Sequence, residues 1–185
     1  MILFFDTETT GLPKNYKALA SDLENWPRLV QLAWQVYGEE ELVSERSLIV
    51  KPEGFEIPGA ASAIHHVTQE RALTEGIPLL DALQEFREAL EPCELLVAHN
   101  LDFDVKIVGA EFLRVGLEFP QIEGYCTKLQ GTDLCKLPGK FGYKWPTLQE
   151  LHIFLFGKGF EAAHDALVDV KACASCFWEM QRREG

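Results

Sequence analysis

Four acidic residues stand where a strand ends or a helix begins, a placement that most of the 29 acidic residues of this chain do not share. Asp6 and Glu8 close a short apolar run, and their spacing of two puts them on the same side of a strand. Asp104 follows a second apolar strand, and Asp169 follows His164 near the start of the last helix. Because such positions meet at one edge of a mixed sheet, we expect the four carboxylates to converge.

Converging carboxylates repel one another, so they cannot all ionise cheaply without a cation. Mg²⁺ and Mn²⁺ prefer oxygen ligands and also bind phosphate. Two such ions can stabilise both the attacking and the leaving oxygen of a phosphodiester cleavage. His164 adds a base that is neutral near pH 7 and can accept a proton from an attacking water. The residue types therefore predict metal-dependent hydrolysis of a phosphodiester.

Apolar periodicity predicts the elements that position these residues. Strands are expected at 2–5, 30–37, 42–50, 95–98 and 122–126. Helices are expected over 78–91 and from about 102 to 115, with two more starting near 147 and near 165, where Asp165 is a good N-cap. The segment 53–68 and the Gly-containing segment after 126 read as loops. The second and third strands form a hairpin, so we expect an α/β fold with one mixed five-stranded sheet flanked by helices.

Composition limits the classes of protein that the chain can be. Its 185 residues suit one domain over 1–185, and a net charge of −12 argues against binding nucleic acid by bulk electrostatics. An apolar stretch long enough to cross a bilayer is absent, and the N-terminus lacks a basic leader, so we expect a cytoplasmic protein without a membrane partner. The five dispersed cysteines read as reduced thiols. Cys173 and Cys176 have helical core spacing, so no structural zinc is expected.

One basic segment stands out from the acidic background. Residues 128–144 contain four lysines against one acid, and aromatic residues follow or interleave: Lys128, Lys136, Lys140, Lys144, Phe141, Tyr143 and Trp145. Lysines reach phosphates and aromatic rings stack on bases, which is typical of proteins that bind single strands. Lys144 is our candidate contact. The alternative is a solvated loop, and we expect Trp145, which precedes Pro146, to fold back against the core.

Three motifs in order resemble those of the DEDDh 3′–5′ exonucleases. Phe5-Asp6-Thr7-Glu8-Thr9-Thr10-Gly11 is similar to the first motif, His99-Asn100-Leu101-Asp102-Phe103-Asp104 to the second and His164-Asp165-Ala166-Leu167-Val168-Asp169 to the third. This superfamily includes the proofreading subunit of bacterial DNA polymerase III, ribonuclease T and oligoribonuclease. Each motif alone is weak evidence, but three in the family's order cover nearly the whole chain.

The resemblance implies a ribonuclease H-like fold and removal of nucleoside 5′-monophosphates from the 3′ end of single-stranded DNA or RNA, with DNA favoured. It implies two divalent cations, Mg²⁺ or Mn²⁺, on Asp6, Glu8, Asp104 and Asp169, with Asp6 bridging them and His164 as general base. By the same resemblance, the residues near the terminal nucleotide are Thr9, Leu12, His65 and Phe103. His66 stands where the family's IHGIT segment has glycine.

Two alternatives remain open from the sequence. A haloacid-dehalogenase-like phosphatase also places an acidic pair after its first strand, but its parallel sheet does not suit the hairpin at 30–50. A non-catalytic module of the exonuclease fold would dock on a polymerase, and a polymerase partner could also accompany an active nuclease. DNA against RNA is undetermined, since the motif residues act on phosphate and metal.

Overall fold

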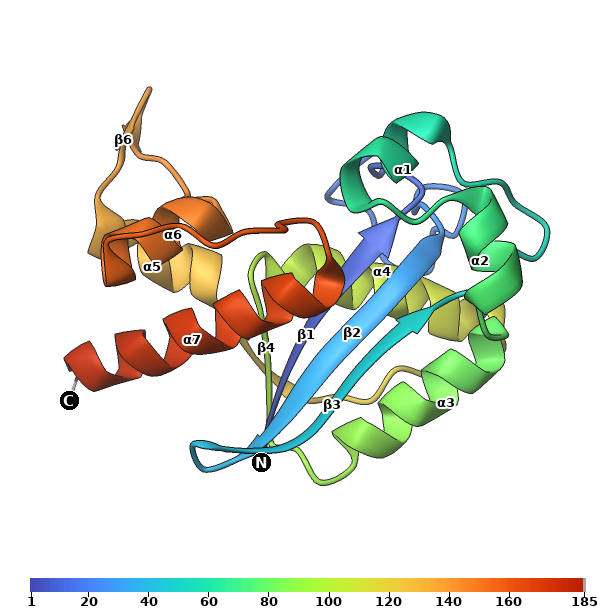
Figure 1. Ribbon diagram of the computed structural model, residues 1–185, viewed down its shortest axis with the longest axis horizontal. Coiled ribbons are helices and arrows are strands. Elements are labelled where there is room, and N and C mark those ends of the chain that lie inside the picture. Colours follow the sequence, from blue (N-terminus) through green and yellow to red (C-terminus); the bar gives the residue numbers. More distant parts are fainter. Residues whose placement is uncertain (185) are drawn as a thin grey trace.

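Within residues 1–184, which the computed structural model describes, five strands form one mixed sheet (Figure 1). They are β1 (Ile2–Thr9), β2 (Leu29–Gly38), β3 (Glu41–Ile49), β4 (Leu95–Ala98) and β5 (Glu123–Cys126). The strand order is β3-β2-β1-β4-β5, with β2 antiparallel to β1 and to β3, and with β4 parallel to β1 and to β5. The predicted hairpin and mixed sheet are confirmed, and the antiparallel pairing of β1 with β2 does not suit the parallel sheet of the phosphatase alternative.

The central strand β1 is buried on both faces, and its alternation assigns each side chain to a layer. Leu3 and Phe5 pack with α3 (Leu79–Leu90) and α4 (Leu101–Arg114). Phe4 packs on the opposite face against α7 (Ala166–Glu184). The sheet therefore lies between two helical layers, and even-numbered residues of β1 face α7.

Three helices occupy segments that the sequence does not mark as helical. The predicted loop at 53–68 contains α1 (Gly59–His65), which starts after Pro58, and α2 (Gln69–Glu75) follows it. Proline is tolerated before or at a helix start, because the first N–H groups have no helical partner. The predicted loop after 126 is also wrong, because α5 (Thr127–Cys135) occupies it.

Helix α5 escapes sequence analysis because its buried face is made of small residues rather than an apolar stripe. Thr127, Gly131 and Cys135 lie four residues apart and are buried. A side-chain carbon at Gly131 would lie 3.0 Å from Leu151 Cδ1, so glycine permits close packing against α6 (Leu148–Phe156). A short hairpin of β6 (Pro138–Gly139) and β7 (Gly142–Tyr143) projects beyond these helices (Figure 1).

A buried carboxylate joins α4 to the start of β2. Glu111 is 0% exposed and accepts hydrogen bonds from Arg28 Nε and from the Leu29 backbone N–H, both at 2.9 Å. Arg114 Nη1 lies 3.0 Å from the same carboxylate. Two guanidinium groups and a backbone donor thus hold α4 against β2 at a fixed position.

Among residues 1–184, each helix is too short or too polar to cross a bilayer.

Candidate active site

The alternation of β1 directs its two acidic side chains toward α7. Ile2 and Phe4 pack on the α7 side of the sheet, and Asp6 and Glu8 continue the same face of the strand. Asp169 lies in the first turn of α7 and meets them there. The structure thus brings together acids that are more than 160 positions apart in the sequence.

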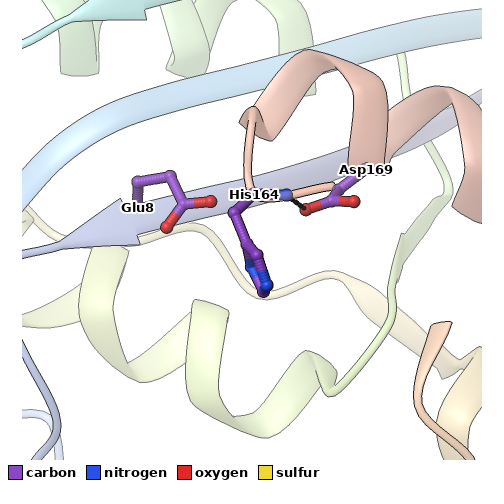
Figure 2. A group of neighbouring side chains, drawn as sticks. All are labelled: Glu8, His164 and Asp169. Carbon is purple, nitrogen blue, oxygen red and sulfur yellow. Dashed lines mark hydrogen bonds between the residues drawn. The ribbon is translucent and has the colours of Figure 1, made fainter. Parts of the chain in front are cut away.

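Figure 2 shows Glu8 on β1 and Asp169 on α7, with His164 between them. One ligand atom from each of these residues lies within 4.8 Å of the other two, a spacing that one cation could span. The donor set is two carboxylates and an imidazole, and carboxylate oxygens are the ligands that Mg²⁺ and Mn²⁺ prefer.

Asp104 reaches the site from the first turn of α4 and is 2% exposed. Its Oδ1 accepts two hydrogen bonds from Thr7, one from the hydroxyl at 2.6 Å and one from the backbone N–H at 3.1 Å. Thr7 points to the α4 side of β1 while its neighbours Asp6 and Glu8 point to the α7 side. The motif residue between the two acids therefore holds the third acid in place.

His164 occupies an exposed position just before α7, with a left-handed backbone (φ 72°). Its backbone N–H donates to Asp169 Oδ2 at 2.9 Å, the dashed line in Figure 2. Asp165 caps the helix by accepting from the N–H groups of Leu167 and Val168. These bonds fix the loop, so the imidazole is presented beside the acids.

Burial and mutual repulsion make the ionised acids costly. Burial raises the pKa of Asp6 well above its usual range, and the charges of Asp104, Asp169 and Glu8 raise it further. Burial is also the main cause that raises the pKa of Glu8 to about 8 and of Asp104 to about 7. The pKa of Asp169 is raised by burial and partly restored by the His164 N–H. Such a cluster is stabilised by divalent cations, and the residues present therefore fit the expected metal site.

A cleft of about 610 Å³ opens beside the acids. Asp6, His164 and Asp169 line it together with Lys128 and Trp145. A molecule in this cleft would touch the acids, the imidazole and a positive charge at once, as a phosphodiester at the end of a strand requires.

His99 supports the opposite wall of the cleft. Its Nε2 lies 3.1 Å from the Pro146 carbonyl, which can only accept, so this nitrogen carries the proton. Its Nδ1 lies 3.0 Å from the Thr127 hydroxyl. Burial lowers the pKa of His99 to about 4, so the ring is neutral at physiological pH and ties the loop at Pro146 to the end of β4. These contacts give His99 a structural role.

The five predicted substrate contacts lie outside the set of described residues that line the cleft. Thr9 is buried and its hydroxyl donates to the Gly11 carbonyl at 2.7 Å, whereas Leu12 is 75% exposed. His65 is 4% exposed. Phe103 packs near the rings of Tyr16 and Trp26, and Lys144 Nζ is paired with Glu150 Oε1 at 2.5 Å. Their roles in binding remain predictions.

The backbone conformation of His66 shows why the family segment has glycine at this position. His66 is the residue after α1 and adopts a left-handed conformation (φ 62°), with its N–H donating to the Ser62 carbonyl. Glycine adopts this conformation without steric cost, which accounts for glycine at this position of the family segment. The substitution by histidine keeps the helix end intact here.

Sequence reasoning missed Thr7 and placed Trp145 wrongly. The sequence offers only a weak signal for Thr7, its position between two motif acids. The sequence predicts that Trp145 packs on the core, but its side chain is 61% exposed. The contacts of the Pro146 carbonyl and the cap at Thr147 hold the backbone that directly follows it. Lys128 was one of several lysines in the basic segment, and only the fold shows that it lines the cleft.

The sequence profile of the family described as Exonuclease (RNase T) matches residues 3–177. The chain belongs to this exonuclease family. With the three motifs in order, it is a DEDDh-type 3′–5′ exonuclease family member and thus a nuclease of the hydrolase class.

Individual relatives agree with this assignment. The DNA polymerase III subunit epsilon of Treponema pallidum (strain Nichols) is 25% identical over 179 residues, which are 95% of this chain and 74% of that protein. The structure of E. coli exonuclease I in complex with a dT13 oligonucleotide superposes with a TM-score of 0.77 at 18% identity, over 99% of this chain and 42% of that chain. Exonuclease X in complex with 5′ overhanging duplex DNA gives a TM-score of 0.63 at 22% identity, over 100% and 94%.

These solved structures establish the ribonuclease H-like fold. The chain spans about two fifths of the length of the exonuclease I chains that it matches (40% to 43%), so it corresponds to one part of them.

Proposed function

We propose that this protein hydrolyses phosphodiester bonds at the 3′ end of single-stranded nucleic acid, with DNA favoured and RNA possible, and releases nucleoside 5′-monophosphates. We further propose that residues 1–185 act as one catalytic domain in the cytoplasm. The observation that carries the proposal is a group of four mutually repelling carboxylates, of which Glu8 and Asp169 lie beside His164, next to a cleft that a lysine also lines. Electrostatic repulsion among these acids has a use only if cations and phosphate are to be bound.

Each residue has a distinct part in this proposal. Two divalent cations, Mg²⁺ or Mn²⁺, would be held by Asp6, Glu8, Asp104 and Asp169. When bound, they supply charge neutralisation for the phosphate and for the attacking and leaving oxygens. His164, on a backbone held by Asp169, accepts the proton of the attacking water as general base. Thr7 keeps the Asp104 carboxylate oriented.

The preference for DNA is supported by relatives whose structures contain DNA oligonucleotides. The resemblance to a DNA polymerase III subunit supports a polymerase as a possible partner. The proposed metal ligands would act on phosphate and leave the sugar undetermined, so the sugar preference needs a direct test.

The test is a 5′-labelled single strand incubated with the purified protein and Mg²⁺ or Mn²⁺. A ladder of fragments that shorten from the 3′ end is expected, with nucleoside 5′-monophosphates as products. Asp6→Asn should abolish the ladder, and His164→Ala should slow it by about 100-fold, as loss of a general base does. A matched control is Asp133→Asn, an acid outside the cluster, which should cut at the wild-type rate.

An untouched strand with both metals, or full activity of the Asp6→Asn protein, would contradict the proposal. An intact strand together with a folded protein that binds a polymerase would favour the non-catalytic module. The same assay on DNA and RNA of matched sequence decides the sugar preference.

A further inference from the structure

Trp145 is an exposed aromatic side chain on a firmly held backbone. It is 61% exposed, yet the next residue, Pro146, accepts a hydrogen bond from His99, and Thr147 forms a capping box with Glu150 at the start of α6. Burial of an indole is favourable, so a large aromatic side chain held at the surface by a fixed backbone is typical of a binding surface.

Lys128 stands next to this indole. Its Nζ lies 4.6 Å from the centre of the Trp145 ring and donates to the amide oxygen of Asn100 at 2.9 Å. This hydrogen-bond partner is neutral, and the positive charge of Lys128 also lowers the pKa of the buried Asp104 carboxyl, so the ammonium lies close to the acids. Asn100 precedes α4, the helix that carries Asp104, so the pair is placed relative to the acids by the motif segment itself.

The pair lies between two hollows of the surface. The cleft with Asp6 and His164 is one of them, and a second hollow of about 440 Å³ is lined by Tyr16 and Leu129. Lys128 and Trp145 line both hollows, as does Asn100. A strand whose 3′ end reaches the acids can leave the cleft over this pair and continue into the second hollow.

We propose that Lys128 and Trp145 form a nucleotide subsite, in which the indole stacks on an unpaired base upstream of the 3′ nucleotide and the ammonium contacts a phosphate of the strand. This inference rests on the proposed function and deepens it, since it names the feature of the substrate that is recognised. A stacked base must be free of its pairing partner, so the subsite selects single-stranded ends. It depends on a base face and a phosphate, not on base identity.

Tryptophan fluorescence tests the subsite directly. Trp26 and Trp34 are buried and Trp178 is half-buried among the aromatic residues of the α7 layer, so Trp145 is the indole open to a base. An eight-nucleotide oligothymidylate is titrated with Mg²⁺ into His164→Ala protein, which keeps the four proposed metal ligands and should consume the strand only slowly. Quenching is expected in this protein and in its Trp178→Phe version, and it should vanish in its Trp145→Phe version. Quenching that survives Trp145→Phe, or quenching absent throughout, overturns the subsite.

Kinetics on the otherwise wild-type chain give a second readout. Trp145→Ala should raise KM for the oligothymidylate about 10-fold or more, while Trp145→Phe, which keeps an aromatic ring, should stay within about threefold. Phe154→Ala is the matched control, because Phe154 is also an exposed ring near a cation, Arg183, outside both hollows. An unchanged KM in Trp145→Ala with normal strand shortening defeats the subsite alone, whereas no shortening by the wild type defeats the proposed function.

Discussion

At the scale of single residues, the site is defined by carboxylates that the fold buries without a positive partner strong enough to neutralise them. Asp6, Glu8, Asp104 and Asp169 all have a pKa above the usual range, chiefly because they are buried. The free energy for this arrangement must come from the rest of the fold until cations are bound. Stability should therefore depend on pH and on metal in a characteristic way.

Glu8→Gln tests this dependence. The pKa of Glu8 is raised to about 8 in the folded chain, above its unfolded value, so the metal-free wild type loses stability as pH rises from about 5 to 8. Glutamine at position 8 does not titrate, so the variant should differ little from the wild type at pH 5 and exceed its free energy of unfolding by about 1 to 3 kcal/mol at pH 8.5. Urea denaturation in EDTA measures the difference. Saturating Mg²⁺ should reverse the order. A variant no more stable than the wild type at pH 8.5 in EDTA would contradict this prediction.

His66→Gly concerns a second residue under local strain. The left-handed backbone of His66 costs a non-glycine residue about 1 kcal/mol, which glycine would not incur. Part of the stabilisation by glycine is lost because glycine has more conformational freedom in the unfolded chain. We expect a net stabilisation of about 0.5 kcal/mol by urea denaturation. His66→Ala, which keeps the strain, is the control and should not be stabilised.

The acidic residues of the site could be predicted from the sequence because they lie in motifs at strand ends and helix starts. The residues that hold them in position by hydrogen bonds could not be predicted. Thr7 and His99 act through hydrogen bonds to residues 97 and 47 positions away, and no local pattern encodes such partners. The exposure of Trp145 is not encoded locally either, because His99, which follows β4, holds the carbonyl of the adjacent Pro146. The identity of a side chain predicts the chemistry it can perform, whereas the residues that hold it in position depend on tertiary contacts.

At the scale of elements, strands and amphipathic helices follow from apolar periodicity, and α5 does not. The predicted strand at 95–98 coincides with β4, since a short apolar run between polar turns is typical of a buried strand. Helix α5 has glycine in its interior and a face of small residues, so its helical state depends on packing against α6 and α7. The first turn of this helix carries Lys128, and a sequence-based loop assignment therefore misplaces that residue.

Glu111→Gln tests the contact that positions α4 against β2. The carboxylate is fully buried and serves Arg28, Arg114 and the Leu29 N–H, so its neutralisation leaves two guanidinium groups uncompensated. A loss of about 2 to 4 kcal/mol in the free energy of unfolding is expected by urea denaturation. Glu85→Gln breaks the exposed ion pair with Arg46 and should cost less than about 1 kcal/mol. Equal losses in the two variants would rule out a special role for Glu111.

At the scale of the whole molecule, an acidic chain must attract an acidic substrate by local means. The net charge is −12, and the cations of the site and Lys128 supply the positive charge near the cleft. Few phosphates are neutralised in such a contact, so affinity should depend weakly on salt.

The salt dependence follows as a prediction. With Mg²⁺ constant, raising NaCl from 50 to 200 mM should raise KM for a single strand by about 10-fold or less, as expected when about two phosphates are neutralised. Initial rates on a labelled oligothymidylate measure this. A loss of 1,000-fold or more would show an extended charged interface that this surface does not account for.

Mn²⁺ binding shows whether the buried carboxylates hold divalent cations, as proposed for this site. The electron paramagnetic resonance signal of free Mn²⁺ counts the ions bound by metal-free protein in the presence of thymidine 5′-monophosphate. Two ions per chain are predicted for the wild type, and fewer for Asp6→Asn, which removes the charge of a proposed ligand. A wild type that binds no ion at millimolar Mn²⁺, or an Asp6→Asn protein that binds as many as the wild type, would contradict the account.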